Sequence, residues 1–426
     1  MEKIAKGLLY DCSWQIFKSI DSRIGTSKIK IVTGLRRSGK SYLLNTIFTN
    51  YLLSKGVDKS HIIFIELDDE KNEYLLEKGK LREYIENIAS DDNAQYYIIL
   101  DEIQLVENFV RAVNSLNKHK NYDLYITGSN SKFLSKDIND EFKDRGTEIN
   151  IRPLSFSEFY PAYKGEKKDA LNYYLVYGGM PGLFEEPNDL AKKEYLDRLM
   201  KKVYIDDIRK NINTGLIDEL SATVDALCSV TGNLTNPLNM THYLKSNKNI
   251  KIDNETVARF FEGIKDAFLF DEVKKFNIKG LEYLNTPSKF YCRDIGLRNV
   301  RLNFREQNKG FLIENCVYNE LRTRGYDVDV GFIEKKFKDR NGKWQYKQNE
   351  VDFIARKYDK QYYIQVVDKM PKYGHEENEY ESLQSVPGSF KKLLVVNDNF
   401  IEYTNNDGIL IISLEKFLLD YRSLDI

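Results

Sequence analysis

One short segment, residues 34–41, constrains the fold of this 426-residue chain more than any other. It reads Gly34-Leu35-Arg36-Arg37-Ser38-Gly39-Lys40-Ser41, and it lies between an apolar run at residues 28–33 and a periodic apolar stretch at residues 41–55. Glycines between a strand and a helix let the backbone N–H groups face phosphate oxygens, and the helix points its positive dipole end at the same place. The pattern predicts a phosphate-binding loop in an α/β fold.

The motif assigns a role to most positions of this loop. We expect Lys40 to reach the β- and γ-phosphates of a nucleotide and the Ser41 hydroxyl to bind Mg²⁺. The chain contains no Asn-Lys-x-Asp sequence to read guanine, so ATP with Mg²⁺ is the expected ligand. The residues predicted to line the nucleotide are Gly34, Leu35, Arg36, Arg37, Ser38, Gly39, Lys40, Ser41 and Tyr42.

The first third of the chain alternates β-rich apolar runs with amphipathic helical stretches, which is typical of a parallel sheet covered by helices on both faces. The predicted strands are residues 28–33, 61–67, 96–100, 122–127 and 148–151. The predicted helices at 41–55 and 109–118 are long enough to be the crossovers between them. We therefore expect an open α/β domain over residues 1–155.

Two acids follow the apolar run at residues 96–100. Asp101 and Glu102 should lie at the carboxyl edge of the sheet, where open α/β folds bind their ligands. Asp101 is then placed to hold the Mg²⁺ shell, and Glu102 to act as the base that polarises an attacking water.

Polar side chains also follow the next strand. The segment Thr127-Gly128-Ser129-Asn130 offers small polar side chains, above all Ser129 and Asn130, that either sense the γ-phosphate or orient the water, or cap their own loop. Arg145 either supplies positive charge to the transition state or pairs with a surface acid.

The remaining chain changes pattern twice. A glycine-rich turn at residues 177–182 precedes a helix-rich run, two further helices at 236–245 and 254–268, and two strands at 268–273 and 289–292. Helix, turn, helix and hairpin is a winged-helix outline, which we place in a second domain at 156–300. A helix at 311–324, several strands and a closing helix indicate a smaller α/β domain at 301–426.

Composition limits the classes of function. Lys and Arg number 64 against 65 acids, so any binding to nucleic acid must come from a local patch. The four cysteines and four histidines are dispersed and match no zinc or disulfide pattern. No apolar run approaches the roughly 20 residues of a membrane span, so we expect a soluble cytoplasmic protein with no membrane partner.

Four segments together resemble a family of prokaryotic AAA-type P-loop ATPases. They are residues 34–41, 96–102, the Arg-Pro-Leu-Ser-Phe-Ser-Glu-Phe block at 152–159 and the Tyr-Gly-Gly-Met-Pro turn at 177–181. The resemblance implies an AAA-like ATPase core, a winged-helix middle and a C-terminal restriction-endonuclease-like domain of unknown function. It also implies that Arg145 matches the family's arginine before the Pro-Leu-Ser-Phe block, and it implies no known substrate.

Three C-terminal residues resemble the acid positions of a PD-(D/E)xK nuclease, namely Glu314, Asp352 and Gln365. Such a site needs clustered carboxylates for Mg²⁺ and a lysine two residues after the third acid. Here Gln365 replaces that acid and Val367 the lysine, with Lys369 as a substitute only if the strand continues. We therefore expect a degenerate structural or binding domain rather than an active nuclease.

Basic residues provide a second, weaker indication of nucleic-acid binding. A hairpin at residues 335–347 combines lysines with Trp344 and Tyr346, which could stack on bases, although a solvated tip is the simpler interpretation. In the winged-helix outline the presumed recognition helix also carries Glu255, Glu262 and Asp266, which favours packing between domains over DNA binding. The basic residues of that outline are Lys245, Lys248, Arg259, Lys265, Lys274, Lys275 and Lys279.

These patterns lead to one main hypothesis, an ATP-binding and hydrolysing protein whose nucleotide state controls the attached module and its interaction with DNA or a protein. The alternatives are a nucleotide-gated scaffold with negligible turnover and an ATP-coupled, metal-dependent nuclease. A small-molecule kinase is the weakest, because nothing in the sequence defines an acceptor pocket. Homo-oligomerisation stays open, since Arg145 could act within its own subunit or in a neighbour.

Overall fold

The structure is a computed structural model that describes residues 20–89, 94–128, 142, 145–305, 309–338, 343–370 and 376–425. Its contacts divide the chain into two compact units. The first unit comprises Met1–Pro153 with Asp266–Phe268, and the second comprises Leu154–Lys265 with Leu269–Ile426. No helix in the described part of the chain is both long and apolar enough to cross a membrane.

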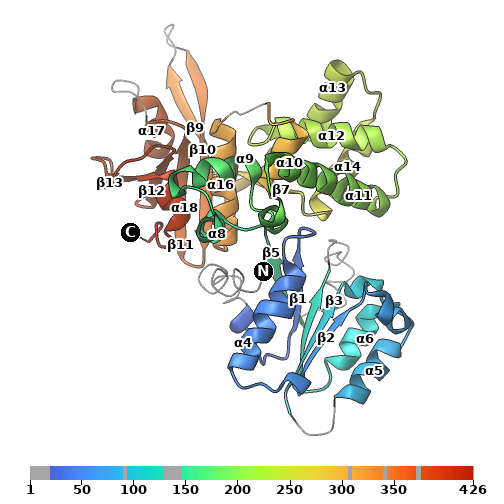
Figure 1. Cartoon of the computed structure of the whole chain (residues 1–426). Coiled ribbons are helices and arrows are strands. Elements are labelled where there is room, and N and C mark those ends of the chain that lie inside the picture. The colour runs from blue at the N-terminus through green and yellow to red at the C-terminus, as the bar shows by residue number, and fades with distance from the viewer. Residues whose placement is uncertain are drawn as a thin grey trace. The chain divides into compact units, whose positions relative to one another are not determined.

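A five-stranded parallel sheet forms the centre of the first unit, in the order β2-β3-β4-β1-β5 (Figure 1). The strands are β1 (Ile29–Gly34), β2 (Ile62–Glu66), β3 (Tyr96–Asp101), β4 (Tyr122–Thr127) and β5 (Gly146–Ile151). Each strand agrees with its predicted range to within two residues. The parallel α/β class expected from the sequence is therefore confirmed.

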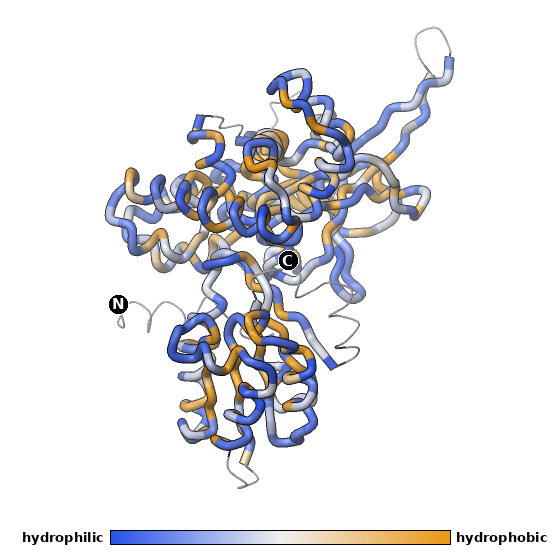
Figure 2. The backbone as a smooth tube through the Cα atoms, turned by 90° about the vertical axis from the view of Figure 1, so that its right-hand side faces the viewer, coloured by the Kyte–Doolittle hydropathy of each residue, from blue (hydrophilic) through white to orange (hydrophobic). Residues whose placement is uncertain are grey.

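Burial explains why these segments are strands. Every residue of β1 and β4 is buried, as expected for a parallel sheet that is covered on both faces. Along β3, Ile98 and Leu100 pack into one core and Ile99 into the other, because successive side chains point to opposite faces. In Figure 2 the tube of the first unit carries several hydrophobic stretches between hydrophilic ones.

The helices of the first unit are α3 (Lys40–Tyr42), α4 (Thr49–Ser54), α5 (Lys80–Ile88) and α6 (Phe109–Leu116). A π-helical stretch at Leu43–Phe48 joins α3 to α4, so helical backbone runs without interruption from Lys40 to Ser54. This run corresponds to the predicted helix at 41–55. Shorter 3₁₀ turns lie at Lys59–His61, Glu70–Leu75 and Ile103–Leu105.

A nine-stranded mixed sheet extends through the second unit, in the order β13-β14-β12-β11-β10-β9-β7-β8-β6. The strands are β6 (Leu234–Thr235), β7 (Phe270–Asn277), β8 (Glu282–Cys292), β9 (Asp327–Lys338), β10 (Trp344–Lys357), β11 (Lys360–Val367), β12 (Lys391–Val396), β13 (Tyr403–Thr404) and β14 (Ile409–Ser413). The pairs β7/β9, β11/β12 and β12/β14 are parallel, and the other neighbours are antiparallel.

Helices pack on this sheet and extend beyond it. They are α8 (Phe156–Ala162), α9 (Ala170–Tyr177), α10 (Asp189–Arg198), α11 (Asp206–Asn211), α12 (Ile217–Ser229), α13 (Pro237–Lys248), α14 (Asn254–Asp266), α15 (Ile295–Arg301), α16 (Lys309–Thr323), α17 (Glu376–Gln384) and α18 (Leu414–Leu419). Further turns lie at Lys167–Asp169, Pro181–Glu185 and, as a π-helical stretch, Leu199–Ile205.

The sheet is continuous across the predicted boundary between residues 300 and 301. Strand β7, from the expected middle domain, pairs in parallel with β9, from the expected C-terminal domain, through Lys275–Val330 and Phe276–Gly331. Local patterns in a sequence do not show which distant strands will pair. Segments 156–300 and 301–426 consequently fold as one compact unit in the structure.

A buried carboxylate fixes the glycine-rich turn that follows α9. Asp294 caps α15 by accepting a hydrogen bond from the Leu297 N–H, and it also accepts one from the Gly179 N–H at 2.8 Å. Residue 179 must be glycine here, because a Cβ would lie 2.0 Å from the Leu154 carbonyl oxygen. The motif at 177–181 therefore has a structural role in the second unit.

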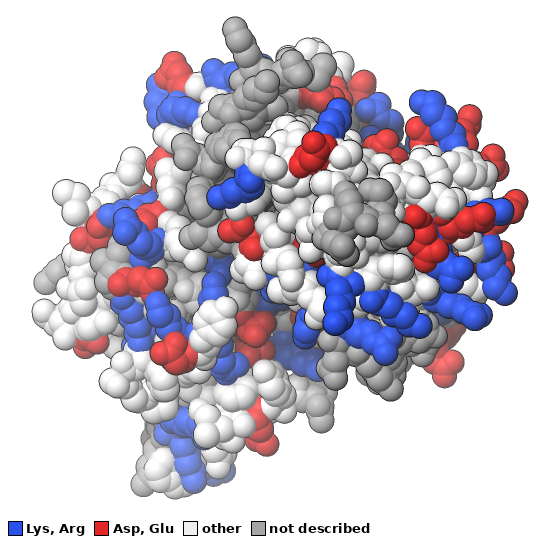
Figure 3. Space-filling view, turned by 90° about the horizontal axis from the view of Figure 1, so that it is seen from below, with Lys and Arg blue, Asp and Glu red and all other residues white. Residues whose placement is uncertain are grey.

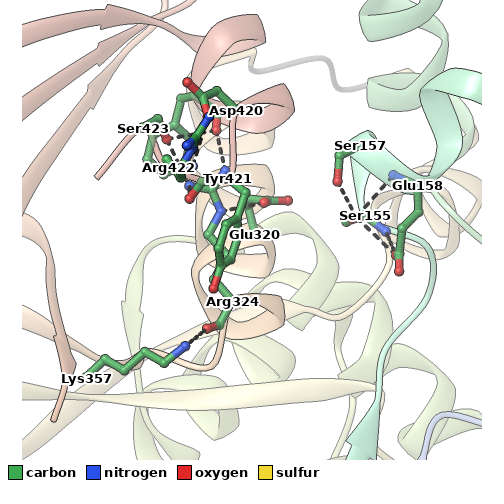
Figure 4. Close-up of polar contacts among 11 residues, drawn as sticks. Ser155, Ser157, Glu158, Glu320, Arg324, Lys357, Asp420, Tyr421, Arg422 and Ser423 are labelled. Carbon is green, nitrogen blue, oxygen red and sulfur yellow. Dashed lines mark hydrogen bonds and ion pairs between the residues drawn. The ribbon is translucent and has the colours of Figure 1, made fainter. Parts of the chain in front are cut away.

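Another buried polar cluster ties the C-terminal segment to α16 (Figure 4). Arg324 is 1% exposed and donates to Glu320 at 2.6 Å, to Ser423 at 2.9 Å and to the Phe417 carbonyl. Such multiple charge-assisted bonds compensate for burying a guanidinium. The chain after α18 is thereby held against the helix that precedes β9.

Candidate functional site

The loop at residues 34–41 joins β1 to the helical run from Lys40. Gly34 has a φ of 140°, and a Cβ there would lie 2.0 Å from the Ile151 carbonyl oxygen, so the close approach of β5 requires glycine. Gly39 precedes α3 with a φ of 99°, a value that side chains disfavour. Both glycines of the motif are thus needed for the backbone path itself.

Lys40 lies inside this loop. Its ammonium donates to the carbonyl oxygens of Gly34 and Leu35, each at 3.1 Å. Burial lowers its pKa to about 8, while the nearby carboxylates of Glu102 and Asp101 oppose this shift. The cation therefore lies within electrostatic reach of both acids at the same edge of the sheet.

One orphaned polar group supports an anion-binding role for the loop. The Ser38 side chain is only 4% exposed, and its hydroxyl oxygen has no hydrogen-bond partner in the described structure. A buried hydroxyl without a partner is costly unless a ligand satisfies it. A phosphate oxygen in the loop would do so.

The other predicted contact residues differ in exposure. Leu35 is fully buried in the protein, so only its backbone is available to a nucleotide. Arg36, Arg37 and Tyr42 are exposed, and Ser41 is half-buried at the first turn of the helical run. Their contacts with a nucleotide stay a prediction.

Asp101 ends β3 beside the loop and Glu102 follows it, and Thr127, the first of the polar residues named after the next strand, connects them. The Thr127 hydroxyl, at the end of β4, donates to the Asp101 carboxylate, and its oxygen accepts from the Glu102 N–H at 3.0 Å. Parallel pairing of β3 with β4 brings the two strand ends together. The signal in the sequence was the position of Thr127 as the last residue of a buried strand, whereas Ser129 and Asn130 lie outside the described residues.

Glu102 has a backbone conformation that is uncommon for a non-glycine residue, with a φ of 54°. The Gln104 side-chain amide donates to its carboxylate. The left-handed backbone of Glu102 and the hydrogen bond from Gln104 together orient its carboxylate, which would otherwise move freely in solvent. Gln104 is a residue that the sequence did not indicate.

Within the part of the chain that the structure describes, the carboxyl edge of the five-stranded sheet offers too few protein ligands to hold Mg²⁺ alone, so a bound phosphate would have to complete the shell of the ion. Among the described residues, no three His, Cys, Asp or Glu side chains are grouped to hold a metal ion by themselves. Mg²⁺ in proteins commonly takes one or two side-chain oxygens and completes its shell with water and phosphate. Ser41 and Asp101 fit that requirement.

Arg145 lies at the other end of the sheet. It precedes β5, whose first residue Gly146 pairs with Ile29 at the start of β1, while the loop begins at Gly34 at the end of β1. Ile29 and Gly34 are five residues apart along β1, and at roughly 3.3 Å per residue this places the start of β5 about 16 Å from the start of the loop. Its guanidinium donates to Asn114 of α6 at 3.2 Å. A catalytic role for Arg145, in its own subunit or in a neighbour, stays a prediction.

The three residues of the nuclease-like set, Glu314 of α16, Asp352 of β10 and Gln365 of β11, lie in one polar cluster. The Asp352 N–H donates to the Gln365 side chain at 3.3 Å, and the Val366 N–H donates to the Asp352 carboxylate at 2.8 Å. Burial is the main reason why the pKa of Asp352 is raised well above its usual value, and the negative charge of Glu314 is the second.

A lysine that the sequence analysis did not consider neutralises this cluster. Lys289 of β8 forms ion pairs with Glu314 at 2.9 Å and with Glu350 at 2.7 Å, and its side chain is about 5% exposed. Its pKa is raised, because the attraction of Glu314, Asp352 and Glu350 outweighs the effect of burial. The suggested substitute, Lys369, lies beyond the end of β11 at Val367, so the strand does not continue to it.

Two of the lysines named for nucleic-acid contact in the middle segment are engaged inside the protein. Lys265 pairs with Glu262 and Glu272, each at 2.8 Å, and Lys275 is 8% exposed with its ammonium 4.4 Å from the centre of the Phe332 ring. On the face drawn in Figure 3, Lys and Arg side chains are interspersed with Asp and Glu side chains. For the middle segment, the contacts of Lys265 and Lys275 inside the protein favour packing over DNA binding.

Comparisons with known proteins agree with the site. Residues 26–160 match the AAA domain family, and residues 168–308 match a domain of unknown function (DUF8612). An uncharacterized protein of Haemophilus influenzae is 31% identical over 399 residues, which cover 92% of this chain and 95% of the relative. The uncharacterized protein MJ1544 of Methanocaldococcus jannaschii is 29% identical over 421 residues, covering 95% and 87%.

Solved structures with some similarity include the Aeropyrum pernix ORC1 protein in complex with DNA and Cdc6p of Pyrobaculum aerophilum. Each has a TM-score of 0.29 and 10% sequence identity. The first match covers 68% of this chain and 92% of the other, and the second covers 71% and 92%.

Proposed function

The chain belongs to a family of P-loop proteins with an AAA domain that includes the Haemophilus influenzae relative, and on this premise we propose that it binds ATP and hydrolyses it. The observation that carries the proposal is the position of Lys40. Its buried ammonium occupies a glycine-rich loop and lies within electrostatic reach of Asp101 and Glu102.

The chemistry of the proposed reaction follows from these residues. Lys40 and the loop N–H groups bind the β- and γ-phosphates and neutralise charge that develops on them. Ser41 and Asp101 would hold Mg²⁺, which supplies further charge neutralisation between the phosphates. Glu102 polarises the attacking water and accepts its proton. Thr127 and Gln104 hold Asp101 and Glu102 in position.

ATP binding tests the phosphate site directly. We expect Lys40→Ala to weaken ATP binding at least tenfold in a fluorescence or calorimetric titration. A matched control is Lys55→Ala, which alters an exposed lysine just after α4, at the far end of the same helical run. If Lys40→Ala bound ATP as tightly as the wild type, the assignment of the loop would be wrong.

We further propose that the nucleotide state controls the second unit and its interaction with DNA or a protein partner. In support, α12, α13 and α14 precede the β7–β8 hairpin, which β6 joins, and this is the order of a winged helix. A helix followed by three antiparallel strands, a helix and further parallel strands, as in α16 to β14, is consistent with a nuclease-like core. Comparing the association state and DNA binding of the ATP-bound and ADP-bound protein tests this control.

The ion pairs of Lys289 argue against nuclease activity. A metal-dependent nuclease needs its carboxylates free to hold Mg²⁺, whereas Glu314 and Glu350 here share a buried ammonium. We therefore propose a degenerate domain. Any Mg²⁺- or Mn²⁺-dependent cleavage of DNA that Asp352→Ala abolished would contradict this proposal.

A nucleotide-gated scaffold remains the second candidate. The φ of 54° at Glu102 and its hydrogen bond from Gln104 favour a working base over a scaffold. Tight ATP binding without turnover in the wild type would support the scaffold instead.

A further inference from the structure

Two central strands of the nine-stranded sheet, β9 and β10, extend beyond the strands on either side of them and form a two-stranded arm. The arm consists of residues 334–338 of β9 and residues 343–348 at the start of β10, and its strands pair through Lys336–Tyr346 and Lys338–Trp344. Strand β7 pairs with β9 only as far as Phe332, and β11 pairs with β10 only from Phe353. Among the described residues no further strand pairs with the arm on either side, and Figure 1 shows it extending beyond the sheet.

Two large aromatic side chains are exposed on the arm. Trp344 is 56% exposed and Tyr346 is 60% exposed. Because they are two residues apart in one strand, they lie on the same face. Lys336 lies across from them, with its ammonium 4.8 Å from the centre of the Trp344 ring and 5.7 Å from the centre of the Tyr346 ring. This face thus combines two accessible rings with a positive charge.

Charge on the arm is strongly one-sided. Its eleven residues, 334–338 and 343–348, include five lysines and one acid, Glu334, although the whole chain carries a formal charge of −1. One of the lysines, Lys347, pairs with Glu381 of α17 near the base of the arm. Because the chain as a whole is nearly neutral, it can attract a polyanion only through a local excess of positive charge, and the arm provides one.

We propose that this arm binds a single strand of nucleic acid, with unpaired bases stacked on Trp344 and Tyr346 and the backbone phosphates neutralised by the lysines. Aromatic faces accept any unpaired base, whereas in a duplex the bases are stacked on each other and are not available. Lys336 of β9 lies near both rings, and the exposed Lys343 directly precedes Trp344 of β10, so both sides of the arm provide positive charge. The proposal goes beyond the proposed ATPase function, because binding at the arm requires neither nucleotide nor hydrolysis.

The experiment measures binding of a fluorescein-labelled 20-nucleotide oligodeoxythymidine to the full chain by anisotropy, without ATP, in 100 mM salt. We expect the double variant Trp344→Ala/Tyr346→Ala to bind at least tenfold more weakly than the wild type, since it removes both rings on which bases would stack. Lys336→Gln should weaken binding and flatten its salt dependence. The matched control is Tyr358→Ala, which removes a tyrosine that is 98% exposed just beyond the other end of β10.

Two further measurements keep the result interpretable. Trp344→Phe/Tyr346→Phe should retain most of the affinity, which shows that the loss in the alanine variant comes from the rings rather than from misfolding. A 20-base-pair duplex should bind more weakly than the single strand. The proposal is overturned if the wild type does not bind the oligonucleotide, if the alanine variant binds it as the wild type does, or if the duplex binds more tightly. Wild-type ATP binding in the same preparation separates failure of this proposal from failure of the proposed function.

Discussion

At the scale of single residues, the state of Lys40 determines how ATP binding should depend on pH. Its pKa of about 8 lies below the ordinary value because the side chain is buried. Phosphates bind the charged ammonium, so above pH 8 the lysine must take up a proton when ATP binds. We expect ATP affinity to be nearly constant from pH 7 to 8 and to fall by up to about tenfold per pH unit above it.

A calorimetric titration at pH 7, 8 and 9 checks this dependence. Lys40→Gln keeps a polar side chain without a titrating group, so its weaker binding should not change over the same range. An equally flat profile for the wild type would show that Lys40 stays charged and that its burial has no effect on binding.

The contacts of Thr127 with Asp101 and Glu102 come from the structure and give this residue a specific positioning role. Its hydroxyl donates to the Asp101 carboxylate and accepts from the Glu102 N–H. Thr127→Val removes both hydrogen bonds, so neither group would be held in position. We expect kcat for ATP hydrolysis to fall about 10-fold to 100-fold, as for other residues that orient a ligand of a metal, with a smaller change in KM. Steady-state kinetics of Thr127→Val and Thr127→Ser test this, because serine keeps the hydroxyl and should restore most of the activity.

At the scale of secondary-structure elements, the turn between α9 and the Pro181–Glu185 turn should be sensitive to a single methyl group. Gly179→Ala would place a Cβ 2.0 Å from the Leu154 carbonyl oxygen and disturb the hydrogen bond from the Gly179 N–H to Asp294. We expect a loss of about 2–4 kcal/mol in the free energy of unfolding, measured by urea denaturation. Gly215→Ala is the matched control, since a Cβ there meets nothing within 4 Å. Equal effects of the two substitutions would contradict the structural role of the turn.

The elements of the first unit could be predicted because local signals were sufficient. Strands β1 and β4 are buried along their whole length, and the loop at 34–41 joins a strand to a helix in an unambiguous pattern. The polar connections were not predictable. Thr127 meets Asp101 only because β4 pairs with β3, and Lys289 meets Glu314 only because β8 lies against α16. Both contacts depend on distant segments, and a sequence without its pairings does not reveal them.

At the scale of the whole molecule, buried acids make the stability of the second unit depend on pH. Burial raises the pKa of Glu158 to about 7 and that of Asp294 to about 6, against opposing hydrogen bonds to each. An acid with a raised pKa in the folded state stabilises the fold below its unfolded pKa, and this contribution is lost as the pH rises through the folded value. The free energy of unfolding should therefore fall between about pH 4 and pH 7.

Glu158→Gln tests the larger of these two contributions. Glutamine keeps an oxygen that can accept the Ser155 N–H bond at the start of α8 (Figure 4) but cannot ionise. Between pH 4.5 and pH 7.5 the free energy of unfolding should decrease in both proteins. The decrease should be smaller in the variant than in the wild type, by up to about 3 kcal/mol. Glu166→Gln, at a side chain that is 71% exposed, is the control and should follow the wild type. A wild-type protein whose stability did not decline over this range would show that Glu158 ionises normally.

The central claim is that this AAA-domain protein hydrolyses ATP with Glu102 as its base. The most direct measurement is Mg²⁺-dependent ATP turnover by the wild type and by Glu102→Gln, each with and without DNA, with Glu107→Gln as a control at an exposed acid five residues further along the chain. The expected result is turnover in the wild type and in Glu107→Gln, and loss of turnover in Glu102→Gln with ATP binding retained. Unchanged turnover in Glu102→Gln, or a wild type that binds ATP and never hydrolyses it, would contradict the claim.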